Sequence, residues 1–429
     1  MSNSSPKALH IALNSVNEDS RVLKCAWTLG NAGWDVEVIG ATPFTYSDQL
    51  TIGYAKILRL PLKPVVTQAF LARFLRALRY YRRRIYQILQ IKEEINIPNL
   101  NRAVRAVAPE VLRFSPDVIH AHDYTALPIA AALVDLLRRQ GKNTSLIYDA
   151  HEYVPGVAHL TKPLAALYSK KEREYSHLSA AVLSVSEPMS DLLMEHLQIT
   201  TRPVIVANDP LVAGQQPSSK NLREDCAIGQ GVPLMVYSGA VAPQRGVQTA
   251  LAAMRLMPDV HLALIANPAN QSVKDLVAGA PDLADRFHVL PYVPNAELVS
   301  YLSSADIGLI PLLHRLNHEI SLITKFGEYM QAKLPILVSD VKTMAAEVQR
   351  LGNGEVFTAE DVESFVVAAK KIFADPDSYR RKYTDSMLAE RSWERQGEVL
   401  VSTYNQIAGA TPTARPLMPF TITKALPLQ

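Results

Sequence analysis

Cysteine and long apolar runs are scarce in this chain of 429 residues. Its two cysteines, Cys25 and Cys226, lie far apart, which excludes a disulfide framework and any cysteine-rich metal site. No stretch reaches the roughly 18 consecutive apolar residues that a membrane-spanning helix requires. The first residues lack the apolar run that a secretion signal needs. These absences predict a cytoplasmic protein whose contact with a membrane, if it has one, is peripheral and on the inner face.

A strong net charge is also absent, but the charges are unevenly placed. The 44 lysines and arginines exceed the 41 aspartates and glutamates by only 3, so the total charge indicates no partner. The stretch Gln49–Lys92, however, contains no acidic residue at all. Ten basic residues lie within the same stretch, which marks it as a candidate surface for an anionic partner.

Part of this stretch has the pattern of an amphipathic, cationic helix. Apolar residues of Gln68–Ile91 recur at spacings of 3 and 4. The helix would either pack on the protein with its arginines solvated or dock to an anionic membrane surface. We expect no nucleic acid partner, because no nucleic-acid-binding module accompanies the patch. The membrane-contact residues would be Arg73, Arg76, Arg79, Arg82, Arg83 and Arg84.

The composition and the order of elements predict the fold class. An apolar content of 48% with 20% charged residues is typical of globular proteins and excludes a disordered or fibrous chain. Short apolar or β-branched runs alternate with helical patterns, which predicts βαβ units and parallel sheets. The pattern occurs in both halves. We therefore predict an α/β protein with two doubly wound, Rossmann-like domains that face each other across a ligand-binding cleft.

Clusters of turn-forming residues place the boundaries. The N-terminal domain is predicted to cover residues 1–207, and a linker rich in glycine, proline and serine covers 208–231. The C-terminal domain covers 232–392, and a final helix at 393–408 crosses back to the first domain. Residues 409–429 contain prolines and no helical period, so they are predicted to form a flexible tail.

A strand, a loop with glycines and a helix follow one another from Tyr237 onward. Gly239 permits a tight turn, and Gly246 lets the backbone approach a ligand. The helix beginning near Val247 directs its N–H groups at the loop, where they suit a phosphate. Arg245 adds a fixed positive charge for a diphosphate. Taken alone, the segment fits an ordinary strand–loop–helix turn equally well.

A second group of polar residues, between Asn317 and Glu328, lies at and just before the predicted helix Ile320–Ala332. If the helix extends far enough to include all of them, they share one helical face. A lysine can meet phosphate, and a carboxylate can accept hydrogen bonds from ribose hydroxyls. The alternative is a solvated helical face with an incidental Lys–Glu pair. Spacings of 4, 4 and 3 separate Asn317, Ser321, Lys325 and Glu328.

Histidines and carboxylates follow two expected strands of the first half. Because parallel strands end at the same edge of a sheet, we expect these side chains where ligands bind. Two histidines without a defined third ligand are weak evidence for a metal, so the sequence predicts none. The residue types alone would permit a metal site formed from His120, His122, Asp123, His151 and Glu152.

Together these segments resemble the family 4 glycosyltransferases of GT-B fold, from about Leu9 to Ile407. Each motif is weak by itself, and the resemblance rests on their order and spacing. The motifs are Asp19–Val22, His120–Asp123, Tyr148–Glu152, Ser238–Gly246, Pro291–Pro294, Ser304–Gly308 and Lys325–Asp340.

The resemblance implies a metal-independent glycosyltransferase without a cofactor. It would move a sugar from a nucleotide-sugar, a UDP- or GDP-sugar, to a lipid-linked or glycan acceptor with retention of configuration. By motif match, the catalytic residues would be Arg245, Lys325 and His122. Donor-binding residues would be Gly239, Gly246, Ser321, Glu328, Tyr292 and Val293. The acceptor side would be lined by Asp19, Arg21, Asp123, His151 and Glu152.

Two departures from the family pattern keep other functions open. The family often has an arginine where this chain has Ala240, and Ile320 stands where the first of two paired glutamates is usual. Glu319 is one position off, which is about 100° of helix rotation. The alternatives are a sugar-nucleotide epimerase of the same fold and a non-catalytic member that binds a membrane or partner. An oxidoreductase is disfavoured because the loop Asn14–Asp19 lacks the Gly-x-Gly-x-x-Gly pattern.

Overall fold

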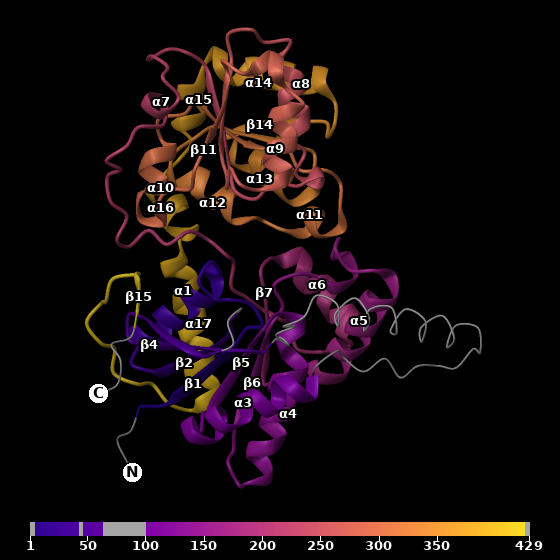
Figure 1. Cartoon of the computed structure of the whole chain (residues 1–429), viewed down its shortest axis with the longest axis vertical. Coiled ribbons are helices and arrows are strands. Elements are labelled where there is room, and N and C mark those ends of the chain that lie inside the picture. The colour runs from indigo at the N-terminus through magenta and orange to yellow at the C-terminus, as the bar shows by residue number, and fades with distance from the viewer. Residues whose placement is uncertain (1–4, 43–45, 63–99, 425–429) are drawn as a thin grey trace, which may run out of the picture. The chain divides into compact units, whose positions relative to one another are not determined.

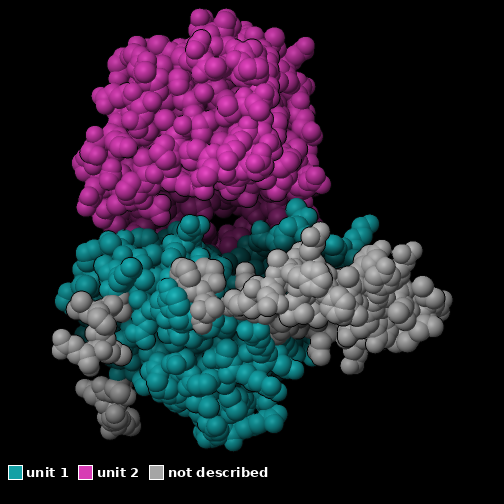
Figure 2. Space-filling model, in the orientation of Figure 1, with its two compact units in different colours: residues 1–183, 193–204, 401–429 teal, residues 184–192, 205–400 magenta. Residues whose placement is uncertain are grey.

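The computed structural model describes residues 5–42, 46–62 and 100–424. The predicted amphipathic helix lies outside the described residues, together with Arg73, Arg76, Arg79, Arg82, Arg83 and Arg84. The chain divides into two compact units, which Figure 2 shows in different colours. Unit 1 comprises residues 1–183, 193–204 and 401–429. Unit 2 comprises residues 184–192 and 205–400.

Unit 1 is built on a nine-stranded sheet in the order β15-β3-β4-β2-β1-β5-β6-β7-β8 (Figure 1). Strands β1, β2, β4, β5, β6 and β7 pair in parallel, whereas β3 and β15 run antiparallel to their neighbours. The inner strands are buried along nearly their whole length, as expected of strands covered on both faces. The bounds are Lys7–Ile11 (β1), Asp35–Ala41 (β2), Asp48–Ile52 (β3), Ala55–Leu60 (β4), Val118–His122 (β5), Ser145–Asp149 (β6), Ala181–Ser184 (β7), Val204–Ile205 (β8) and Ile422–Lys424 (β15).

The helices of unit 1 connect these strands, and the first shows how the sequence sets a helix start. Asp19 caps α1, because its Oδ1 atom accepts the N–H of Val22 at 3.2 Å. Helix α4 begins directly at the end of β5, so the polar residues of the His-Ala-His-Asp motif lie where strand becomes helix. The bounds are Ser20–Asn31 (α1), Leu100–Phe114 (α3), Asp123–Arg139 (α4), Val154–Gly156 (η1) and Lys162–Ser176 (α5), and Glu187–Leu197 (α6) begins in unit 2 and ends in unit 1.

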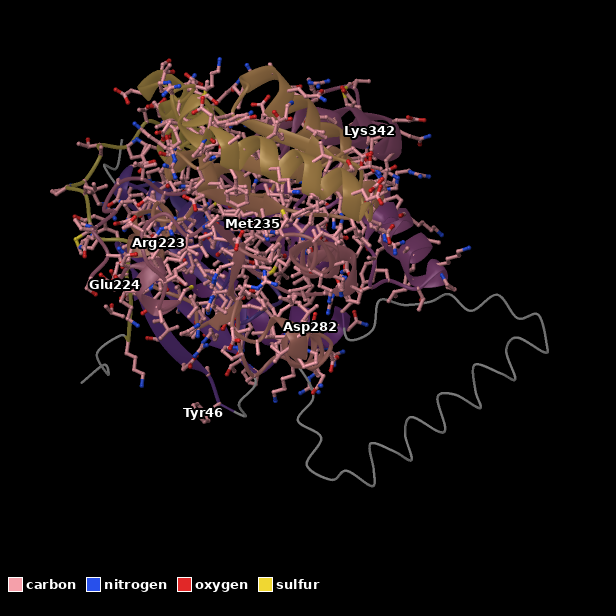
Figure 3. All side chains as sticks on the ribbon, turned by 90° about the horizontal axis from the view of Figure 1, so that it is seen from above. Tyr46, Arg223, Glu224, Met235, Asp282 and Lys342 are labelled. Atoms are coloured by element: carbon pink, nitrogen blue, oxygen red, sulfur yellow. The ribbon has the colours of Figure 1, made fainter. Side chains whose placement is uncertain are left out.

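Unit 2 is a six-stranded sheet in the order β11-β10-β9-β12-β13-β14, and its pairs are parallel. One apolar cluster packs α8, α9 and α14 on one face, and a second packs α7, α10, α12 and α13 on the other. Met235 of β9 lies in this interior, whereas Asp282 and Lys342 lie toward the outside (Figure 3). The strands are Leu234–Ser238 (β9), His261–Ile265 (β10), Phe287–Leu290 (β11), Ile307–Ile310 (β12), Ile336–Ser339 (β13) and Gly354–Phe357 (β14).

The helices of unit 2 cover both faces of this parallel sheet, which confirms the predicted α/β class with two Rossmann-like domains. Their bounds are Leu222–Asp225 (α7), Pro243–Arg245 (η2), Val247–Met254 (α8), Gln271–Ala278 (α9), Pro281–Leu283 (η3), Asn295–Leu302 (α10), Leu316–Ile320 (α11), Thr324–Gln331 (α12), Lys342–Leu351 (α13), Val362–Ala374 (α14), Pro376–Arg380 (α15), Asp385–Glu390 (α16) and Trp393–Ala408 (α17), which continues into unit 1.

In each sheet the strand order reverses beside a central strand. In unit 1 the reversal lies between β1 and β5, and in unit 2 between β9 and β12. Loops that leave the carboxyl ends of such a pair diverge to opposite faces and leave room for a ligand. The histidine motifs of unit 1 and the Gly239–Gly246 loop of unit 2 follow these strands. The sequence motifs therefore lie at the two places where the topology predicts binding.

The predicted linker 208–231 is part of unit 2 rather than a free connection. Its short helix α7 buries Leu222 in the apolar core. Arg223 donates to Asp306 Oδ2 at 2.8 Å and to the carbonyl oxygen of Val232 at 2.7 Å. A buried arginine needs such partners, so this network fixes the segment against β9 and β12. The turn-forming composition of the segment gave no sign of this anchoring.

The predicted flexible tail is wrong for the described residues that follow α17. Helix α17 runs from unit 2, where Trp393 is buried, into unit 1, where Tyr404 is buried. The chain then lies along unit 1. The backbone carbonyl oxygen of Met418 accepts the indole N–H of Trp27 at 2.8 Å, and the backbone N–H of Arg415 donates to the carbonyl oxygen of Asn31 at 2.7 Å. Strand β15 finally pairs with β3. We call residues 410–424 the C-terminal strap.

No helix in the described parts of the chain is both long and apolar enough to cross a membrane.

Asp375 lies between α14 and α15, where its side chain accepts the N–H of Ser378 at 3.1 Å and caps α15.

Candidate active site

The loop between β9 and α8 contains the two glycines that the sequence singled out. Gly239 has φ +124° and Gly246 has φ +69°, and both values favour glycine. A Cβ atom on Gly246 would lie 1.8 Å from the carbonyl oxygen of Pro311, in the loop after β12. The absence of a side chain therefore lets two loops at the switch point meet. Contact of Gly246 with a ligand remains a prediction.

Lys325 is directed at this loop from the first turn of α12. Its Nζ atom lies 3.4 Å from the centroid of the Tyr237 ring and 3.5 Å from the position of a Cβ atom on Gly239. The atom is buried and makes no hydrogen bond among the described residues. Burial, and next the charge of Arg245, hold the pKa of Lys325 well below its usual range. An anion at this point would supply the missing hydrogen-bond partner.

The single helix predicted through Ile320–Ala332 is wrong. Helix α11 ends at Ile320, the chain is extended at Ser321 and Ile323, and α12 begins at Thr324. Asn317 and Ser321 therefore do not share a helical face with Lys325 and Glu328, which both lie on α12. The break creates a new helix N-terminus beside Lys325, and no side chain of the N-cap residue Ile323 caps it.

Arg245 lies in η2, half-buried, and its charge acts on Lys325, Tyr237 and His318. His318 is not among the residues predicted from the sequence. Its Nδ1 atom donates a hydrogen bond to the carbonyl oxygen of Leu313 at 2.7 Å, so Nε2 is the ring nitrogen that can bind another group. Burial lowers the pKa of His318, and Arg245 lowers it further despite this hydrogen bond. A helical spacing could not reveal this pair, because a loop brings the two residues together.

Glu319 does not replace the glutamate that the family has at the position of Ile320. Its carboxylate contacts His314 Nδ1 at 2.5 Å and accepts the N–H of Lys342, at the start of α13, at 2.8 Å. His314 also contacts Asp340 Oδ1 at 3.0 Å through Nε2. Ile320 itself is buried. The outcome agrees with the rotation argument from sequence, because the carboxylate of Glu319 is used within the protein.

The remaining donor-side residues of unit 2 differ in exposure. Tyr292 follows β11 and is 54% exposed, whereas Val293 is half-buried and packs against the core. Ala240 is exposed, and its carbonyl oxygen accepts the hydroxyl of Tyr237 at 2.8 Å. Unit 2 thus places two cations, a helix N-terminus and an exposed tyrosine at the carboxyl ends of its strands. This combination can bind the phosphates and the nucleoside of a nucleotide.

Unit 1 has a buried cluster around Asp149, at the end of β6. Arg21 donates to both carboxylate oxygens, at 2.8 Å from Nε and 2.7 Å from Nη2. Burial opposes ionisation of Asp149, but Arg21 and His151 outweigh it and hold the pKa of Asp149 well below its usual range. Arg21 is 3% exposed and pairs with Asp149, so its predicted contact with an acceptor has no support in its position. Its bidentate pairing uses the guanidinium to neutralise a buried carboxylate.

Histidines and one tyrosine surround this carboxylate. His122 Nε2 pairs with His10 Nδ1 at 2.8 Å, and His120 Nδ1 pairs with the Tyr404 hydroxyl at 2.8 Å. His122 is 2% exposed, and its Nδ1 atom faces His151 at 3.2 Å. Both ring nitrogens of His122 thus face protein groups, so direct contact of this residue with a donor sugar has no support in its position. The sequence did not select His10 or Tyr404, because β1 and α17 join this cluster only in the fold.

The accessible edge of the cluster carries the other acceptor-side candidates. His151 is half-buried, and Glu152 is exposed. Asp123 adopts φ +71°, which is strained for a residue other than glycine, and burial raises its pKa to about 7. Asp19 caps α1, and its Oδ2 atom also accepts from Asn14 at 2.7 Å. Asp19, Asp123, His151 and Glu152 therefore lie near one another, and their contact with an acceptor stays a prediction.

Comparison with known protein families identifies the class to which this fold and these two clusters belong. A model described as Glycosyl transferase 4-like domain matches residues 20–209, and one described as Glycosyl transferases group 1 matches residues 232–375. The chain belongs to the glycosyltransferases of GT-B fold. Family 4, which the sequence motifs indicated, fits its first domain.

Individual relatives agree with this class. D-inositol 3-phosphate glycosyltransferase of Mycolicibacterium gilvum is 24% identical over 179 residues, and the match spans 40% of this chain and 39% of that relative. Sucrose-phosphate synthase from Thermosynechococcus elongatus has the same fold, with a TM-score of 0.74, 17% identity and coverage of 94% of this chain and 99% of the other. Anabaena HepE in complex with UDP-glucose gives a TM-score of 0.67, 11% identity and coverage of 93% and 99%.

Proposed function

We propose that this protein transfers a sugar from a nucleotide-sugar, a UDP- or GDP-sugar, to a hydroxyl of a lipid-linked or glycan acceptor with retention of configuration. Unit 2 would bind the nucleotide, and the accessible edge of unit 1 would bind the acceptor. The observation that carries this proposal is the buried Lys325 ammonium, which makes no hydrogen bond among the described residues and is directed at the Gly239 loop.

The chemistry of sugar transfer explains why such a lysine is useful. Breaking the glycosidic bond builds negative charge on the departing phosphate and positive charge on the sugar. A cation fixed at the phosphate stabilises the transition state more than the ground state. Lys325 and Arg245 are two cations held close enough that Arg245 lowers the pKa of Lys325. A diphosphate between them would relieve this repulsion, so no metal ion is needed for the leaving group.

The other donor contacts follow from position. Glu328 lies one turn after Lys325 on α12 and would accept hydrogen bonds from the ribose hydroxyls. Tyr292 is exposed after β11, where its ring could stack on the nucleobase. Support for a uridine nucleotide comes from the fold relative HepE, which holds UDP-glucose. The preference for this base is part of the proposal.

The experiment is a donor screen followed by transfer assays with matched variants. Thermal shift with UDP-, GDP- and ADP-sugars should show stabilisation by one nucleotide, because a ligand of the folded state stabilises it. With that donor, Arg245→Ala should lower transfer by about two orders of magnitude, the usual effect of losing one charge-stabilising group. Arg255→Ala is the matched control, since Arg255 pairs with Asp282 on the surface of unit 2.

The outcomes separate the proposed activity from its alternatives. Retention predicts a product whose anomeric proton has the coupling constant of the donor. Conversion of the donor sugar to its epimer without an acceptor would instead establish the epimerase. Donor binding without turnover on any acceptor would establish the non-catalytic member. Near-normal transfer by Arg245→Ala would reject the diphosphate role of this arginine.

We also propose peripheral binding of the protein to the inner face of an anionic membrane, supported by the acid-free stretch Gln49–Lys92. Cationic and apolar residues together are what such a surface requires. Wild type should sediment with liposomes that contain anionic lipid and remain in solution with neutral ones. An Arg82/Arg83/Arg84→Glu variant that sediments equally well would overturn this proposal.

A further inference from the structure

Three ligand atoms of unit 1 form a nearly equilateral triangle. His122 Nδ1 and His151 Nε2 are 3.2 Å apart, and Asp149 Oδ2 lies 3.4 Å from the first and 3.3 Å from the second. The three residues come from the ends of β5 and β6 and from the loop that follows β6. The sequence prediction of no metal rested on the lack of a third ligand beside two histidines. Asp149, which that prediction did not consider, supplies the third ligand atom.

The side lengths of this triangle match a tetrahedral metal site. Zinc binds histidine nitrogen and carboxylate oxygen at about 2.0–2.1 Å, which places ligand atoms about 3.3–3.4 Å apart in a tetrahedron. An ion equidistant from the three atoms at that bond length would lie less than about 1 Å from their plane. No ligand would have to move by more than a few tenths of an ångström. Two histidines and one carboxylate are also a ligand set that zinc and related ions accept.

The surroundings already hold the three ligands in place. His122 pairs through its other nitrogen with His10 at 2.8 Å, and His10 in turn lies 3.4 Å from the Tyr404 hydroxyl. Arg21 donates to both carboxylate oxygens of Asp149, from Nη2 at 2.7 Å and from Nε at 2.8 Å. Metal-binding histidines and carboxylates in proteins are usually oriented by such partners. The half-buried His151 lies at the accessible edge, which leaves a route for an ion and for a water as fourth ligand.

Hydrogen bonds satisfy this triangle poorly in the tautomer in which His122 Nε2 donates to His10 Nδ1. If His122 donates its proton to His10, its Nδ1 atom presents a lone pair toward the lone pairs of Asp149. One proton on His151 Nε2 would then have to serve two acceptors at 3.2 and 3.3 Å, which are long contacts for charge-assisted bonds. A divalent cation would engage all three lone pairs at once. The neighbouring trio of His10, His120 and His122 is less suitable, because the 2.8 Å pair of His10 and His122 is a hydrogen bond and shorter than a tetrahedral edge.

We propose that His122, Asp149 and His151 form a binding site for a divalent transition-metal ion, with zinc as the preferred ion. The site belongs to unit 1 and is separate from the diphosphate residues of unit 2. The metal-site proposal can therefore be tested independently of the proposed transfer activity. The ion would fix His151 and His122 at the edge where Asp123 and Glu152 also lie, and would leave one coordination position open for water or an acceptor hydroxyl.

The test uses metal alone on the full chain, with Co²⁺ as a spectroscopic probe for zinc. Wild type, freed of metal by a chelator, should bind one Co²⁺ per chain and show the intense visible bands of tetrahedral Co²⁺. Zinc should displace it. His151→Ala should weaken Co²⁺ binding by at least about tenfold. His159→Ala is the matched control, because His159 is exposed in the same loop and should leave binding unchanged.

A second variant keeps the test independent of folding losses. His151→Cys restores a ligand of different chemistry, so Co²⁺ binding should return with an added sulfur-to-metal charge-transfer band in the near ultraviolet. The proposal is overturned if wild type shows no saturable one-to-one binding. It is equally overturned if His151→Ala and His159→Ala bind Co²⁺ alike, or if His151→Cys shows no charge-transfer band.

Discussion

The ammonium of Lys325 stands over the ring of Tyr237, with Nζ 3.4 Å from the ring centroid. The aromatic face partly compensates the charge, but Nζ makes no hydrogen bond among the described residues. A buried donor without a hydrogen-bond partner costs about 1–3 kcal/mol. The fold of unit 2 therefore keeps a destabilising group at the point where a diphosphate would bind.

Replacement of this lysine should separate stability from function. Lys325→Met keeps the length of the side chain and removes the charge, so it should raise the free energy of unfolding by about 1–3 kcal/mol. The same change should abolish binding of the donor nucleotide. Thermal unfolding and nucleotide titration measure the two effects. Lys274→Met, a lysine of α9 away from the site, should change neither, and a destabilised Lys325→Met would contradict the assignment.

Gly246 should be intolerant of any side chain. A Cβ atom would lie 1.8 Å from the Pro311 carbonyl oxygen, and the residue has φ +69°. We expect Gly246→Ala to destabilise unit 2 by more than the roughly 1–2 kcal/mol that the left-handed conformation alone costs. Gly409→Ala isolates that smaller cost, since Gly409 has φ +61° and open space around it. Equal melting temperatures for the two variants would show that the loops can separate without loss.

The C-terminal strap should contribute to the stability of unit 1. Deletion after Ala410 removes the hydrogen bond from Trp27 to Met418, the contacts of Arg415 and strand β15. Each lost hydrogen bond is worth about 1 kcal/mol, so the melting temperature of unit 1 should fall by several degrees. Trp27 fluorescence should shift to the red as the ring becomes hydrated. Deletion after Lys424 keeps the strap and should leave both signals as in wild type.

His314 should make the loop after β12 more stable at low pH. Its hydrogen bond to Glu319 comes first among the causes that raise its pKa above 6.5, and Asp340 adds to the effect. A raised pKa in the folded state means that the contribution is fully present below the unfolded pKa and is lost as pH rises through the folded one. The stability difference between wild type and His314→Gln should therefore be largest at about pH 5.5 and shrink above neutrality. His159→Gln, which alters an exposed histidine, should show no such trend.

The fold class was accessible from the sequence because parallel strands buried on both faces must be apolar throughout. Strands such as His261–Ile265 and Ile307–Ile310 are short apolar runs of this kind. Failures occurred where tertiary contacts override local pattern. The prolines after α17 indicated a loose tail, yet pairing with β3 and the contact with Trp27 order the described part. A continuous helical pattern at Ile320–Ala332 likewise hid the extended segment that starts α12 at Thr324.

The sequence by itself determined the class of this protein. Apolar periodicity, the glycine loop and the histidine motifs specify two Rossmann-like domains of a GT-B glycosyltransferase, because these signals are local or follow chain order. Only the tertiary structure decided which polar groups meet. It turned Arg21 inward onto Asp149 and joined His10 of β1 and Tyr404 of α17 to His120 and His122. Contacts between residues that are more than a hundred positions apart leave no periodic trace, and burial then fixes them by making each unpaired charge costly.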